Sequence, residues 1–222
     1  MQSDPVSPSL PHEKPNGNSC PALAVTLSTE GAVTTEDTGP GGLTPRWTVR
    51  FTITYLDTPH THQEPIIFLK PRLSDHGKYQ LRYLLDGQWH DAEPGIGCMM
   101  GMDLKETELH VVDSRARFVS LHPGEAWETA LSVFQLDWEC PDEDGAAYAG
   151  EVFQLQYLGE SVQWWDYGRH DDHKETVVTV DAFGRVLSPT DNAGRGNLVF
   201  QRSNVLEARW CKPPRSGVGT QY

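Results

Sequence analysis

The segment from residue 47 to residue 56 alternates between apolar and polar side chains, and this alternation constrains the fold more than any other feature. Threonine and arginine occupy the polar positions. The apolar positions hold Trp47, Val49, Phe51, Ile53 and Tyr55. A period of two places successive side chains on opposite faces of a β-strand, and aromatic and β-branched residues suit such a surface. The segment is therefore predicted to be a strand with one buried face.

Short segments of similar character follow along the chain, and no stretch of about eleven residues repeats apolar side chains with a helical period. Residues 65–69 are apolar throughout, which predicts a strand covered on both faces. Further strands are expected over residues 22–27, 79–85, 88–90, 106–112, 116–121, 127–136, 151–157, 162–165, 175–180, 186–187, 197–201 and 205–210. Short strands separated by turn residues are typical of sandwiches. We therefore predict an all-β fold, an immunoglobulin-like antiparallel β-sandwich, with a β-barrel as the alternative.

Turn residues predict how some of these strands connect. Asp86-Gly87 predicts a hairpin between residues 79–85 and 88–90. The break at residues 158–161 predicts a second hairpin, which joins residues 151–157 to residues 162–165.

Two other connections are less regular. Residues 106–112 and 116–121 are expected to pair around residues 113–115, unless the first of them forms a short helix. Residues 31–45 are rich in Thr and Gly and are expected to form a loop.

Composition divides the chain into one folded part and two tails. Residues 1–21 contain five prolines and few apolar residues, so we expect a disordered tail. Residues 22–211 are expected to form the sandwich domain, and residues 212–222 a flexible C-terminal tail.

The charge of the chain argues against two classes of partner. Lys and Arg total 18 against 31 Asp and Glu, which gives a net charge of -13. Nucleic-acid binding requires clustered basic residues, and anionic lipid surfaces repel an acidic chain. We therefore expect no nucleic-acid partner and no membrane partner.

The beginning of the sequence and the cysteines suggest where the protein is located. The first residues lack the basic start and apolar core of a secretory signal. Cys20, Cys98, Cys140 and Cys211 are dispersed and form no CxxC spacing. We expect a cytoplasmic protein with four free thiols, because cytosolic cysteines are kept reduced. No cofactor is expected.

Two motifs resemble a known group of proteins. They are LHPGEAWETALSVF at residues 121–134 and GEVFQLQYLGESVQWWDYG at residues 150–168. Together they resemble uncharacterised immunoglobulin-like β-sandwich proteins of filamentous fungi, in which a PGE turn precedes one strand and a WWDYG-type motif closes a hairpin. The PGE turn is also similar to sandwich modules of the bacterial intracellular proteinase-inhibitor kind. The resemblance implies a sandwich fold and no particular activity.

The end of the WWDYG segment gathers the candidate site residues. Asp166, His170 and His173 are candidates for acid–base catalysis. His170 and His173, three residues apart, are also metal-ligand candidates, and His60 and His62 form a second such pair. The sequence shows no third ligand at a known spacing. A solvated turn is therefore the preferred interpretation of these histidines, and we predict no metal site.

The two adjacent tryptophans are expected to have different environments. Trp164 would share the face of Val162 and lie in the core. Trp165 would then point outward and form a stacking platform with Tyr167 and Arg169, or it would pack under the loop at residues 140–150.

Two residues of the same segment are expected to shape the strand end. Gly168 is expected to adopt a positive φ, and Asp166 to accept backbone amides across that turn.

No complete catalytic constellation is present in the sequence. We therefore predict a non-catalytic intracellular binding or interaction module, with Trp165, Tyr167 and Arg169 contacting its ligand. The alternative is a small-molecule enzyme of a biosynthetic pathway, which would use an inter-sheet or loop-covered pocket, with metal assistance as one option.

Overall fold

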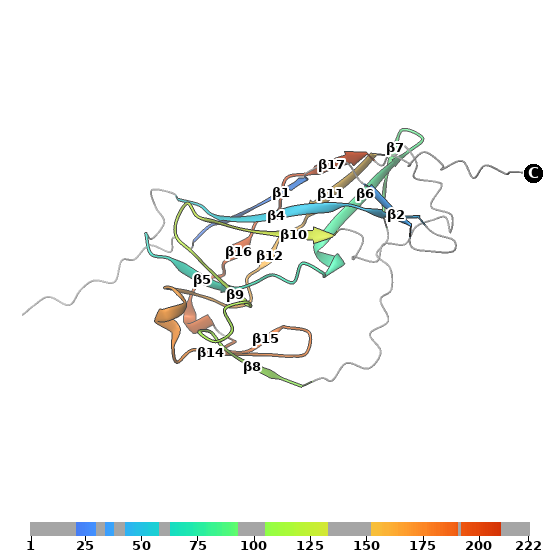
Figure 1. The fold of residues 1–222 in the computed structure, drawn as a ribbon. Helices are drawn as coiled ribbons and strands as arrows, with labels where there is room; N and C mark the ends of the chain where they lie inside the picture. The colour runs from blue at the N-terminus through green and yellow to red at the C-terminus, as the bar shows by residue number, and fades with distance from the viewer. Residues whose placement is uncertain are drawn as a thin grey trace, which may run out of the picture.

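The computed structural model describes residues 21–29, 34–37, 43–57, 63–92, 105–132, 152–190 and 192–209. Within these ranges the chain is all-β, and its helical elements are three short 3-10 turns, His76–Lys78, His170–His173 (η4) and Asn192–Gly194. The described strands form several sheets, mostly antiparallel, and no closed barrel (Figure 1). No helix in the described ranges has the length and apolar character needed to cross a membrane.

Two of the sheets share the main core and form a β-sandwich. The first sheet has the order β10 (Ala126–Ser132), β4 (Thr48–Tyr55), β1 (Leu23–Thr29), β16 (Val199–Phe200) and β12 (Glu160–Ser161). The second has the order β17 (Leu206–Arg209), β11 (Val152–Tyr157), β6 (Tyr79–Leu85) and β7 (Gln88–Asp91). The ring of Phe51 from the first sheet meets the ring of Tyr157 from the second edge to face, with centroids 5.1 Å apart.

Strand β4 confirms the prediction made from its alternation. All five apolar residues from Trp47 to Tyr55 are buried in the main core, and the residues between them are exposed or half-buried. Strand β4 pairs with β1 on one side and β10 on the other, so it lies inside its sheet.

A third sheet lies between two cores. Its order is β13 (Trp165–Tyr167), β5 (Ile66–Leu69) and β9 (Phe118–Leu121). Ile66 and Phe68 of β5 belong to the main core, whereas Ile67 and Leu69 belong to a second, smaller core. All four residues are buried, which confirms the prediction of a strand covered on both faces. Figure 1 shows β5 and β9 between β4 and β10 above and β14 and β8 below.

A fourth sheet completes the second core. It has the order β15 (Val186–Ser188), β14 (Val177–Val180) and β8 (Thr107–His110). Leu109, Val178 and Val180 of this sheet pack with Phe118 and Trp164. The smaller core is therefore built from segments that are distant in the sequence.

One predicted hairpin is confirmed and the other is wrong. Leu85 pairs with Gln88, and both residues of the turn between them, Asp86 and Gly87, have positive φ, as a two-residue turn requires. The second prediction fails because β11 pairs with β6 and β17, while β12 pairs with β16 and β13 pairs with β5. After β11 the chain therefore moves into a different sheet.

Gly159 lies at this crossover, and it has a φ of +82°. A Cβ there would lie 2.6 Å from the carbonyl oxygen of Phe200, so only glycine fits the close approach of the two segments.

Two further expectations about connections are wrong. Strands β8 and β9 do not pair with each other, because β8 pairs with β14 and β9 with β5. Residues 31–45 contain a two-stranded antiparallel sheet of β2 (Thr34–Asp37) and β3 (Leu43–Arg46) instead of only a loop. The prediction gave the glycines of this segment more weight than its β-branched threonines, which favour strands.

Both expected tails lie outside the described residues, apart from Pro21, which is buried. The four cysteines, His60, His62 and the loop at residues 140–150 also lie outside them.

Candidate functional site

Trp165 is not an exposed platform. Its side chain is 2% exposed and packs in the main core. The indole Nε1 donates a hydrogen bond to the carbonyl oxygen of Gly196 at 3.1 Å, and the guanidinium of Arg195 lies over the ring at 5.7 Å. The segment after the 3-10 turn at Asn192–Gly194 therefore covers the Trp165 side chain. The expectation of an outward Trp165 is wrong, because the third sheet has a core on each of its faces.

The other two predicted ligand-binding residues have partners within the protein. Tyr167 is half-buried and meets the ring of Trp165 edge to face, with centroids 5.2 Å apart. Arg169 is exposed, and its guanidinium donates to Nε2 of His122 at 2.6 Å. Neither residue is part of an aromatic platform with Trp165.

Asp166 makes structural contacts. Its Oδ1 accepts the backbone N–H of Tyr167 at 2.7 Å and forms an ion pair with Arg195 at 3.0 Å. The turn after β13 is held by a different carboxylate, because the N–H of Arg169 donates to Oδ2 of Asp172 at 2.8 Å. Gly168 has a φ of +107°, which confirms the expected positive φ. The expectation that Asp166 spans this turn is wrong.

His173 has both ring nitrogens occupied. The side chain is buried, and Nε2 lies 2.9 Å from the carbonyl oxygen of Tyr167. A carbonyl only accepts, so Nε2 carries the proton and donates it. Nδ1 then accepts from the hydroxyl of Thr176 at 3.2 Å. No lone pair of His173 is left for a metal ion or for proton transfer.

His170 is the one predicted catalytic candidate that lines a concave surface. Its Nε2 is buried and has no hydrogen-bond partner within the described structure. Burial lowers the pKa of His170, and the positive charge of Arg115 lowers it further. Among the described residues, no group of three or more His, Cys, Asp or Glu side chains is arranged to hold a metal ion.

The concave surface is an open groove of about 500 Å³ between β9 and β10. It is lined by Lys70, Phe118, Val119, Ser120, Leu121, Glu125, Ala126, Trp127 and His170. Strand β9 therefore contributes all of its residues, and β10 contributes its first two.

Trp127 and Lys70 contact each other in the lining of the groove. Trp127 lies opposite Ile53 of β4, and its half-buried ring packs against the main core. The ammonium of Lys70 lies 5.3 Å from the centroid of this ring and donates to the carbonyl oxygen of Ala116 at 2.7 Å. Burial lowers the pKa of Lys70. No carboxylate of the described chain pairs with this ammonium.

The PGE turn fixes one end of the groove. Gly124 has a φ of +83°, and its N–H donates to the carbonyl oxygen of Tyr55 at 2.7 Å. The N–H of Tyr55 donates in return to the carbonyl oxygen of Glu125 at 2.9 Å. Oε2 of Glu125 accepts the N–H of His122 at 2.8 Å. These bonds clamp the turn to β4, so β9 and β10 leave it in fixed directions into different sheets.

Lys70 and Trp127 were not predicted from the sequence as site residues. Trp127 was recognisable only as the start of a strand beside the PGE turn, and Lys70 only as the residue after a buried strand. Their approach depends on how β5, β9 and β10 pack, which no local pattern contains. No protein-family model matches the sequence, and no significant match is found among curated proteins. The inferences below therefore depend on geometry and charge.

Proposed function

We propose that this protein is a non-catalytic interaction module that binds an extended segment of a partner protein in the groove between β9 and β10. The observation that carries this proposal is that β9 and β10 are both terminal strands of their sheets among the described strands, and both line the groove. The outer edge of a terminal strand presents backbone N–H and C=O groups. An extended peptide adds to such an edge by main-chain hydrogen bonds.

Trp127 supports the proposal as an anchor. Its ring is held from behind by the main core, so little side-chain entropy remains to be lost on binding. Half-buried aromatic residues of this kind commonly carry much of the energy of an interface. A groove of about 500 Å³ has room for side chains of a bound segment beside the ring.

Lys70 indicates the charge of the bound segment. It is a cation without a carboxylate partner among the described residues, on a chain with a net charge of -13. A carboxylate of the partner placed beside Lys70 would gain an ion pair in a partly desolvated position. We therefore expect the segment to carry an acidic residue that lies near Trp127.

The alternative, a small-molecule enzyme, has less support. The groove contains His170, whereas Asp166 is paired with Arg195 and His173 is buried with both nitrogens bonded. General acid–base catalysis needs positioned groups that can exchange protons with a substrate. Of the three catalytic candidates, only His170 lines the groove.

We also infer an immunoglobulin-like arrangement of the strands and a cytoplasmic location. An immunoglobulin-like arrangement of the sandwich is supported by the PGE turn that joins β9 to β10. A cytoplasmic location agrees with four dispersed cysteines, which would stay reduced there.

A library of random linear peptides displayed on phage tests the proposal against the intact chain. We expect the wild type to enrich a family of peptides that share an acidic residue. Trp127→Ala should weaken binding of these peptides by about 30-fold or more, since truncating an aromatic anchor of an interface costs about 2 kcal/mol or more. Trp89→Ala is the matched control, because Trp89 is a half-buried tryptophan on β7 in the second sheet.

Methylation of alternate backbone nitrogens in an enriched peptide tests the mode of binding. We expect methylation in one register to abolish binding, because it removes the donors that pair with the strand edge. Peptides that bind Trp127→Ala as tightly as they bind the wild type would show that the groove is not the site.

A further inference from the structure

Outside the groove, two arginines lie close together with no ion-pair partner among the described residues. Arg72 follows β5, and Arg117 immediately precedes β9. Neither guanidinium makes a hydrogen bond or an ion pair within the described structure. Both side chains nevertheless approach the same point of the turn between β14 and β15, at Gly184.

The approach is close. The position that a Cβ of Gly184 would occupy lies 3.3 Å from Cδ of Arg72, 3.8 Å from Nε of Arg72 and 3.7 Å from Nη2 of Arg117. Gly184 has a φ of +74° and no side chain, so the two arginine side chains share the space above its backbone.

The turn between β14 and β15 is held by its own carboxylate, that of Asp181. Oδ1 of Asp181 accepts the N–H groups of Phe183 and Arg185, each at 2.8 Å. Oδ2 of Asp181 lies 3.7 Å from Nε of Arg185. The carboxylate of Asp181 is therefore engaged with backbone amides and with Arg185, and it forms no ion pair with Arg72 or Arg117.

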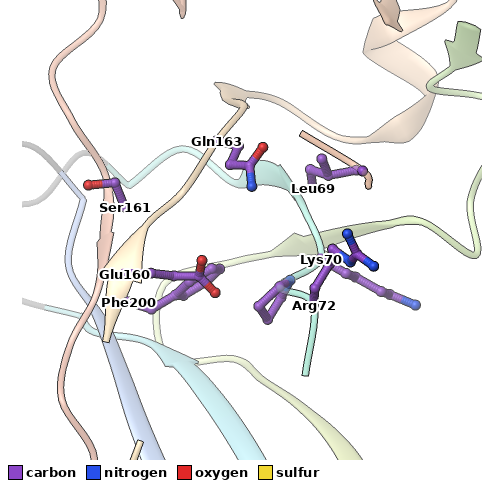
Figure 2. Close-up of a pocket in the computed structure, with 9 residues that line it drawn as sticks. Leu69, Lys70, Arg72, Glu160, Ser161, Gln163 and Phe200 are labelled. Carbon is purple, nitrogen blue, oxygen red and sulfur yellow. The ribbon is translucent and has the colours of Figure 1, made fainter. Parts of the chain in front are cut away.

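The small pocket beside Arg72 contains another carboxylate that is already paired. Figure 2 shows Lys70 and Arg72 across this pocket from Glu160 and Ser161. Glu160 accepts the hydroxyl of Tyr157 at 2.8 Å and pairs with Lys78 at 2.8 Å. The pocket has a volume of about 20 Å³, which is room for a water molecule, so a larger ligand would lie on the surface next to it.

Two adjacent guanidinium groups repel each other, and their repulsion is relieved when an anion binds between them. Guanidinium groups bind tetrahedral oxyanions through paired N–H donors, which makes arginine pairs suited to phosphate. The contrast with the net charge of -13 strengthens the case, because no acidic residue in the described part of the chain forms an ion pair with either arginine.

We propose that Arg72 and Arg117 form a binding site for a phosphate monoester above Gly184. The site does not include Trp127. The proposal of a phosphate site is therefore independent of whether the groove binds a peptide. Phosphoserine in a partner and a phosphorylated small molecule offer the same chemistry, and the experiment distinguishes these two sources.

The test is a titration of the intact chain with inorganic phosphate at constant ionic strength, followed by phosphorus NMR and by thermal melting. We expect saturable binding that chloride does not reproduce. Arg72→Gln and Arg117→Gln should each weaken phosphate binding by about tenfold, since each removes a charge-assisted contact. Arg209→Gln, an exposed arginine on β17, is the matched control and should bind as the wild type does.

A second measurement separates a binding role from a structural one. Without multivalent anions, Arg72→Gln should melt at or above the temperature of the wild type, because it removes a repulsion. A phosphoserine peptide that binds more tightly than glycerol 3-phosphate identifies a partner protein as the source, and the reverse identifies a metabolite. Trp127→Ala should leave phosphate binding unchanged, which separates this site from the groove. Equal phosphate affinities in the wild type and both glutamine variants would overturn the proposal.

Discussion

Trp164 and Trp165 are neighbours in the chain, yet each fills a different core. Trp164 packs in the smaller core against Phe118, with ring centroids 5.5 Å apart, and Trp165 packs in the main core. Their peptide segment runs between the two cores, and the carbonyl of Trp164 accepts the N–H of Leu69 at 3.0 Å. The pair therefore couples the sandwich to the smaller core, and its role is structural.

Substitution of Trp165 should reveal this role. We expect Trp165→Ala to lower the free energy of unfolding by about 3–5 kcal/mol, because a large side chain leaves a cavity and the carbonyl of Gly196 loses its donor. Trp127→Ala, at a half-buried position, should cost clearly less. Urea unfolding measures both values. A Trp165→Ala variant as stable as the wild type would contradict the buried position.

Gly168 should tolerate alanine less well than Gly124. Both have positive φ, but a Cβ at Gly168 would lie 3.2 Å from Oδ2 of Asp172 and 3.3 Å from Nε2 of His173. A Cβ at Gly124 would meet nothing within 4 Å. We expect Gly168→Ala to cost about 1–3 kcal/mol of stability and Gly124→Ala about 1 kcal/mol, from the backbone conformation alone. Equal losses in chemical denaturation would show that the contacts at Gly168 relax without cost.

Asp166 and Arg195 should be energetically coupled. Each side chain is largely buried, and removing one leaves the other without its partner. We expect Asp166→Ala and Arg195→Met each to cost about 1–3 kcal/mol, and the double variant to cost less than their sum by about 1 kcal/mol. A double-mutant cycle in urea measures this coupling. Strict additivity would show that the ion pair contributes nothing to stability.

His170 should make stability depend on pH. Its folded-state pKa lies below the ordinary value of 6.5, because of burial first and the charge of Arg115 second. A backbone hydrogen bond with Phe118 and the charge of Asp171 oppose this shift, and His173 adds slightly to it. As pH falls below 6.5, the unfolded chain binds a proton at this residue before the folded chain does, so unfolding becomes more favourable.

The measurement compares His170→Asn with the wild type. Urea unfolding between about pH 7.5 and pH 5 should show a flatter decline in stability for the variant, because it lacks this proton uptake. An NMR titration of the imidazole checks the direction of the pKa shift. Parallel stability curves for the two proteins would contradict the assignment to His170.

The sequence by itself determined many of the strands and, where the local pattern is regular, the faces that they bury. The alternation of residues 47–55, the apolar run at residues 66–69 and the Asp86-Gly87 turn each carried enough information, because side-chain period and turn conformation are local properties of the chain. The positive φ of Gly168 was predictable for the same reason. Local patterns also suggested a site at the end of the WWDYG segment, where the structure instead engages Trp165, Asp166 and His173 in internal contacts and leaves His170 in the lining of the groove.

Only the tertiary structure decided which strands pair and where a groove forms. Alternation specifies a buried face and not a partner strand, so residues 151–165 suggested a hairpin where the chain changes sheets. For the same reason the burial of Trp165 was not predictable, because the segment that contacts it comes from residues 192–196. Lys70 and Trp127 meet because β5, β9 and β10 pack together, and Arg72 meets Arg117 because both approach Gly184. Such contacts join residues far apart in the sequence, and their energies depend on packing that no single segment encodes.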